Sequence, residues 1–96
     1  MKKLIVQEKV FTEVEGAWLY YEKIITGLGD QFLEDWENIL LYVEKHPEHF
    51  QKRKKDFRCA SLKRFPYMVC FVIEPKFILV YKLIHIRKKP SKRYRQ

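Results

Sequence analysis

Three apolar stretches in the second half of the chain constrain its fold most strongly. They run from Phe57 to Leu62, from Tyr67 to Glu74 and from Phe77 to Ile86, and β-branched and aromatic residues dominate them. Only Lys63–Pro66 and Pro75–Lys76 separate them, which indicates tight turns. The second and third stretches are apolar on both faces, which is typical of central or covered strands. The sequence therefore predicts three successive strands in one sheet.

The first half of the chain predicts a short strand and then a helix. Lys3–Gln7 has a β-branched apolar centre and predicts an opening strand. From about Thr12 apolar residues recur at helical spacing, and Thr12 with Glu15 fits a capping box. We expect Gly27 and Gly29 to end this helix.

A second helix is predicted to begin at Asp30, as its N-cap, and to end near His46, because Pro47 cannot continue it. We expect both tryptophans in the core, on apolar stripes made of Val14, Ala17, Trp18, Tyr21, Ile24 and Ile25, and of Phe32, Trp36, Ile39, Leu40 and Val43. The short glycine-containing link predicts an antiparallel helix hairpin.

These elements predict an α+β fold with the order β-α-α-β-β-β. The helix hairpin would pack on one face of a mostly antiparallel four-stranded sheet, and the other face would be a shallow apolar groove or a partner site. We expect a single domain over residues 1–96, with 90–96 as a basic tail. If Leu62 pairs with Tyr67 across the turn, Cys59 lies opposite Cys70, so that oxidation could join two cysteines that we otherwise expect as buried thiols.

Charge is divided unequally between the two halves. The net charge is +8, but residues 1–48 carry 5 basic and 10 acidic side chains, whereas residues 49–96 carry 15 basic and 2 acidic ones. This asymmetry favours an anionic partner for the second half, either nucleic acid or an acidic protein segment, although a solvated lysine-rich face would give the same pattern. The chain shows no metal motif, no cofactor motif and no apolar run long enough for a membrane span or a signal peptide, so we expect a cytoplasmic location.

Four segments resemble the RelE/ParE family of bacterial toxins. Trp18–Glu22 (WLYYE) is similar to the first helix of ParE-like members, and Gly27–Phe32 (GLGDQF) is similar to their link between helices. The most specific segment is Phe57–Tyr67 (FRCASLKRFPY), which resembles the family's stretch ending in Arg-Phe-Pro-Tyr. The His85-Ile86-Arg87 run, followed by Pro90, resembles the family's closing pattern.

The resemblance implies the toxin of a type II toxin–antitoxin module, of the kind that stabilises plasmids, neutralised by a cognate antitoxin that wraps its apolar surface. RelE-like members cut mRNA in the ribosomal A site, whereas ParE-like members inhibit DNA gyrase by binding. The resemblance leaves both activities open, together with a third interpretation in which an inactive member serves only as an interaction module.

Cleavage of RNA would need cations that hold phosphate and a group that moves a proton. His85 and Arg87 share a face of the last predicted strand, and Arg58 could approach them from a neighbouring strand. These three residues are the candidate catalytic set if the chain is a metal-independent nuclease. The candidate residues for binding nucleic acid or another target are Arg64, Lys88, Lys89, Arg93 and Tyr94. Structural roles remain open, including an ion pair between Arg58 and an acid of the second helix.

Three departures from the RelE-type pattern favour the ParE side of the family. Cys59 and Ser61 replace lysines of the second strand, and Met68 replaces the arginine after the tyrosine of the third strand. We therefore expect inhibitory binding to a target such as gyrase, with ribosome-dependent cleavage as the alternative.

Overall fold

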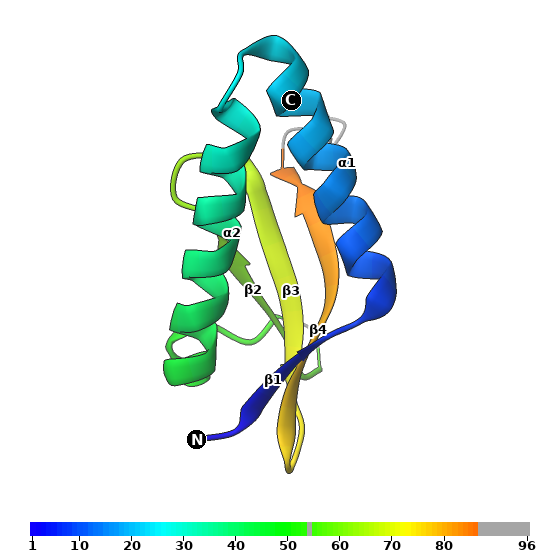
Figure 1. Cartoon of the computed structure of the whole chain (residues 1–96). Coiled ribbons are helices and arrows are strands. Elements are labelled where there is room, and N and C mark those ends of the chain that lie inside the picture. The colour runs from blue at the N-terminus through cyan, green and yellow to red at the C-terminus, as the bar shows by residue number, and fades with distance from the viewer. Residues whose placement is uncertain (54, 87–96) are drawn as a thin grey trace, which may run out of the picture.

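The computed structural model describes residues 1–53 and 55–86 and has the expected α+β architecture. Its elements are β1 (Lys3–Val6), α1 (Glu8–Ile24), α2 (Leu28–Lys45), the short 3-10 helix η1 (Pro47–His49), β2 (Phe57–Ser61), β3 (Tyr67–Ile73) and β4 (Phe77–His85). The order β-α-α-β-β-β is confirmed, and η1 is the one described helix that the sequence did not predict. Figure 1 shows α1 and α2 side by side across the same face of the sheet.

The sheet has the strand order β1-β4-β3-β2. β2, β3 and β4 pair antiparallel, whereas β1 pairs with β4 in parallel, with Leu4 opposite Ile78. The two strands predicted to be apolar on both faces, β3 and β4, therefore occupy the middle of the sheet. A β-bulge between Cys70 and Phe71 shifts the register of β3 against β4.

The core lies between the helix hairpin and the inner face of the sheet. Phe32, Val10 and Val43 of the helices are fully buried against Phe71 and Ile78 of the central strands. Trp36 is buried as predicted, whereas Trp18 is half-buried and packs against the edge of this core. No helix in the part of the chain that the structure describes is long and apolar enough to cross a membrane.

Helix α1 begins four residues earlier than predicted. It starts at Glu8, the N-cap position is Gln7, and that residue makes no capping hydrogen bond with its side chain. The capping-box prediction at Thr12 and Glu15 was therefore wrong, since both residues lie inside the helix. The backbone N–H of Gln7 donates to Val80 O (2.9 Å), so β4 holds the chain where the helix starts.

The link between the helices depends on Glu22, which the sequence did not single out. Gly27 takes the N-cap position of α2 with φ = 95°, a left-handed conformation that favours glycine. The Glu22 carboxylate accepts hydrogen bonds from the backbone N–H groups of Gly27 (2.8 Å) and Gly29 (2.9 Å). Asp30 is therefore not the N-cap, and its Oδ1 instead accepts a hydrogen bond from Trp18 Nε1 (3.1 Å). Gly29 lies inside α2 and does not end α1.

Candidate functional site

Arg64 joins the β2–β3 connection to α2. Its backbone N–H and its Nε donate to the two carboxylate oxygens of Asp35, at 2.6 and 3.0 Å, and its Nη2 donates to Glu34 Oε1 at 2.9 Å. These carboxylates raise the pKa of the Arg64 guanidinium above its ordinary value, with the Asp35 hydrogen bond as the largest cause. Arg64 therefore already has anionic partners within the chain. Two of these three hydrogen bonds go to the buried carboxylate of Asp35.

The residues that follow Arg64 each make a structural contact at this end of the sheet. The Phe65 ring packs edge-on to Tyr21 (centroids 4.8 Å apart) and to Phe32 (5.5 Å). Pro66 O accepts the backbone N–H of Ile86 (2.7 Å), which ties the end of β4 to the connection. The Arg-Phe-Pro-Tyr run thus anchors α1, α2 and β4 to one another.

His85 lies beside Tyr67 at the end of β4. The two residues are register partners in the sheet, and their ring centroids are 4.7 Å apart in an edge-to-face arrangement. Both rings line a hollow of about 320 Å³ against α1, where Gly16 and Tyr20 form the opposite wall. This hollow has the size and composition to receive an aromatic ring, a nucleobase or a peptide side chain.

Tyr67 and Tyr21, near His85, stay protonated at neutral pH. Burial raises the pKa of Tyr67, and the neighbouring Tyr21 and Tyr20 raise it further. Burial likewise raises the pKa of Tyr21. Protonated phenols can donate hydrogen bonds to a ligand.

Arg58 lies far from His85 along the sheet. It pairs with Phe71, four residues along β3 from the Tyr67–His85 pair, which corresponds to about 13 Å along the strand. Its Nη1 donates to Phe50 O (2.6 Å), and its buried Nε has no hydrogen-bond partner among the described residues. The structure thus gives Arg58 a backbone partner in the loop after η1, and not an acid of the second helix.

The remaining predicted site residues lie outside the described part of the chain. Arg87, Lys88, Lys89, Arg93 and Tyr94 all fall within residues 87–96. Of the predicted residues that the structure does describe, only His85 lines the hollow, and Arg58 and Arg64 do not.

Two functional features were missed from the sequence. Asp35 lies outside the predicted apolar stripe, yet its side chain is only 4% exposed and accepts hydrogen bonds from Arg64. Its position three residues after Phe32 was the available signal, since residues at that spacing share a helix face. Tyr20 was passed over because it lies outside the predicted apolar stripe, and it is exposed beside the hollow.

Two apolar surfaces remain open to solvent. On α1 and the turn after it, large apolar side chains are exposed: Phe11, Leu19, Tyr20, Ile24 and Ile25. On the sheet, alternation along the strands directs Met68, Val72 and Leu79 away from the helices, next to the exposed Ile5 and Phe57. Figure 1 shows both helices on the other side of the sheet. Large apolar side chains that gather at a surface are candidates for contact with a partner.

A second hollow lies at the opposite end of the molecule. It measures about 370 Å³ and lies between the N-terminus, the end of α2 and η1, with His46 and His49 in its wall. The centroids of their stacked rings lie 4.6 Å apart, and both residues are exposed. Within residues 1–53 and 55–86, no three His, Cys, Asp or Glu side chains gather to hold a metal ion. This hollow is also remote from His85, so the smaller one remains the candidate site.

The fold has a counterpart among solved structures. A chain from the chromosomal ParDE TA system of P. aeruginosa aligns with a TM-score of 0.67, over 90% of the present chain and 97% of that chain, at 17% sequence identity. The likeness confirms the RelE/ParE-like fold that the sequence resemblance implied. No protein-family model and no curated protein sequence matches the chain.

Proposed function

We propose that this protein is the toxin of a type II toxin–antitoxin module and that it acts by inhibitory binding to a protein target such as DNA gyrase. The observation that carries the proposal is the shared fold, which extends over nearly all of both chains in a comparison with a protein from a ParDE system. Three segments that resemble the RelE/ParE family, Trp18–Glu22, Gly27–Phe32 and Phe57–Tyr67, lie within the described part of that fold. A cytoplasmic location follows from the proposed target.

The arrangement of the described cations supports binding over catalysis. A nuclease of this kind needs positive charge beside the group that moves the proton. Arg64 is held by Asp35 and Glu34, and Arg58 lies about 13 Å away along the strand direction. Arg58 is therefore not beside His85, and the Arg64 guanidinium already neutralises two carboxylates of α2.

The open apolar surfaces support a proteinaceous antitoxin. A segment that covers the exposed side chains of α1, or the uncovered face of the sheet, would remove apolar area from water. The net charge of +8 favours an acidic segment, because opposite charge speeds association and limits the choice of partner.

Toxicity and its relief can be tested in a bacterial host. Induction of the protein alone should arrest growth, and co-expression of a small acidic protein encoded next to it should restore growth. The purified protein should inhibit DNA supercoiling by gyrase. Normal supercoiling at a large excess of the protein would exclude gyrase as the target, and normal growth on induction would favour the inactive interaction module.

A second candidate function is ribosome-dependent cleavage of mRNA, which the His85–Tyr67 pair in its hollow favours. In that case the purified protein should cut mRNA on ribosomes, and His85→Ala should lower the cutting rate by roughly 100-fold or more. His49→Ala is the matched control, because His49 is exposed at the far end of the molecule. Growth arrest that persists in His85→Ala, without loss of mRNA, would exclude this function.

A further inference from the structure

Cys59 and Cys70 face each other across two adjacent strands. They are register partners in the β2–β3 pair, and their Sγ atoms lie 3.4 Å apart in a hydrogen-bonding contact. Both are free thiols in the structure. The pairing predicted from the turn length is therefore confirmed, and the two sulfur atoms are already in contact.

The kind of strand pair they form suits a disulfide bond. The backbone N–H of Leu62 donates to Tyr67 O (2.8 Å), which makes this a hydrogen-bonded pair. Pairs alternate along an antiparallel ladder, so that Cys59–Cys70, three pairs further on, is non-hydrogen-bonded. In such a pair the Cα atoms are about 4.5 Å apart and the side chains approach closely, within the range that a disulfide spans.

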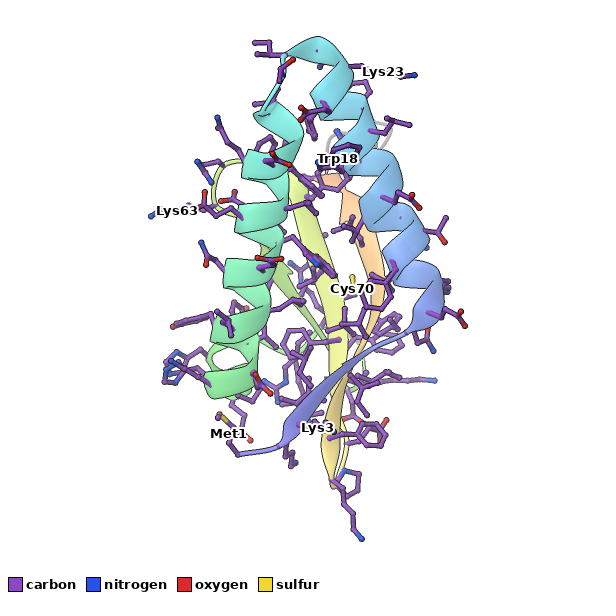
Figure 2. The ribbon with its side chains drawn as sticks, viewed as in Figure 1. Met1, Lys3, Trp18, Lys23, Lys63 and Cys70 are labelled. Atoms are coloured by element: carbon purple, nitrogen blue, oxygen red, sulfur yellow. The ribbon has the colours of Figure 1, made fainter. Side chains whose placement is uncertain are left out.

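The two thiols differ in their access to solvent. Cys70 is 3% exposed and lies midway along β3 (Figure 2), whereas Cys59 is partly exposed on the edge strand β2. Burial and the Cys59 contact raise the pKa of the Cys70 thiol to about 12, against a smaller opposing effect of the positive charges of Lys82 and Arg53. An oxidant from solvent therefore reaches the Cys59 sulfur more readily than the buried Cys70 sulfur.

We propose that Cys59 and Cys70 form a reversible oxidation site, which a hydroperoxide converts into a cross-strand disulfide. The Cys59 sulfur attacks one peroxide oxygen, the O–O bond breaks, and the Cys59 thiol proton passes to the departing oxygen, so that Cys59 becomes a sulfenic acid and the peroxide is reduced to water or an alcohol. The Cys70 sulfur then attacks the Cys59 sulfur, the S–O bond breaks, and the departing hydroxide takes the Cys70 proton to form water. A dithiol reductant reverses the change.

The disulfide would fasten an edge strand to the middle of the sheet. β2 pairs with β3 alone among the named strands, and among residues 1–53 and 55–86 its other side makes the isolated Lys52–Arg58 bridge. A covalent link between Cys59 and Cys70 lowers the conformational entropy of the unfolded chain and keeps β2 paired with β3. Oxidation should therefore raise the melting temperature by roughly 5–15 °C and slow hydrogen exchange in β2.

The test uses the purified full-length protein, reduced and then exposed to an equimolar amount of hydrogen peroxide. We expect both thiols to disappear, the intact mass to fall by two hydrogen atoms, the chain to remain monomeric, and dithiothreitol to restore both thiols. Retention of both thiols, a gain of oxygen without loss of hydrogen, or predominantly intermolecular dimers would each overturn the proposal. These readouts require neither toxicity nor a target, so they are independent of the proposed function.

Two matched variants test the order of the steps. In Cys70→Ser, peroxide should leave Cys59 as a sulfenic acid that a sulfenic-acid trap labels. In Cys59→Ser, the buried Cys70 should react far more slowly and take up little of the trap. Faster labelling of Cys70 than of Cys59 would contradict the assignment of Cys59 as the thiol attacked first.

Discussion

Arg64 and Asp35 form the contact that decides how the β2–β3 connection meets α2. From the sequence, Arg64 is a candidate for target binding, since it lies in a basic turn. The structure shows three hydrogen bonds from Arg64 to Asp35 and Glu34. Arg64, which belongs to the most specific segment of the family resemblance, therefore has a structural role in joining the β2–β3 connection to α2. Its role in target binding stays a prediction.

We predict that Asp35→Ala lowers the free energy of unfolding by about 1–3 kcal/mol, because the Arg64 backbone N–H loses its acceptor. Glu34→Ala is the control, and it should cost less than about 0.5 kcal/mol, because Glu34 is 65% exposed. Urea denaturation of both variants measures the difference. Equal losses would show that the buried carboxylate has no special role.

The helix hairpin depends on a close approach at Gly29. A Cβ atom at this position would lie 2.6 Å from Trp18 O and 2.8 Å from Glu22 Oε1. The same Glu22 carboxylate accepts the N–H groups at the start of α2. A glycine that the sequence presents as a helix breaker therefore acts inside a helix, as the point where α1 and α2 come into contact.

We predict that Gly29→Ala lowers the free energy of unfolding by about 1–3 kcal/mol, because a backbone carbonyl must move to admit the methyl group. Gly16→Ala is the matched control in α1, with no atom within 4 Å of the added Cβ. That change should stabilise the protein by up to about 1 kcal/mol through helix propensity. Thermal denaturation of both variants gives the signs, and a stabilising Gly29→Ala would contradict the close contact.

At the scale of the whole molecule, the fall in stability at alkaline pH reports on the burial of one thiol and three phenol groups. Burial raises the pKa of Cys70 from 9.0 to about 12, and it raises the pKa values of Tyr21, Tyr67 and Tyr81 from 10.0. Above the unfolded values, the native state therefore binds more protons than the unfolded state, and stability falls with rising pH. The stabilising contribution is complete below about pH 9, where neither state has lost these protons.

We predict that the free energy of unfolding, measured in urea under reducing conditions, is constant between about pH 7 and pH 8.5 and falls from pH 9 upward. In Cys70→Ala the fall should begin only near pH 10, where the tyrosines of the unfolded chain begin to lose protons. A constant or rising free energy between pH 9 and pH 11 would contradict the burial of these groups.

The sequence by itself determined the element order, identified β3 and β4 as central or covered strands, and predicted the pairing of Cys59 with Cys70 from a tight turn after Leu62. These features follow from local periodicity and from short turns, which fix register over a few residues. Helix starts were less predictable, because their N–H groups find partners outside the helix. At the start of α1 the partner is Val80 on β4, and at the start of α2 it is Glu22 on α1.

Only the tertiary structure decided which charged groups meet. The sequence brought Arg58 toward His85, but the strand register separates them by four positions along β3. Asp35 lies outside the apolar stripe of its helix, but packing in the folded chain buries its carboxylate against Arg64. Periodicity assigns a side chain to a face, whereas the partner across that face depends on how helices and strands dock. Among the described residues, the strand register therefore separates Arg58 from His85, although both lie in the same sheet.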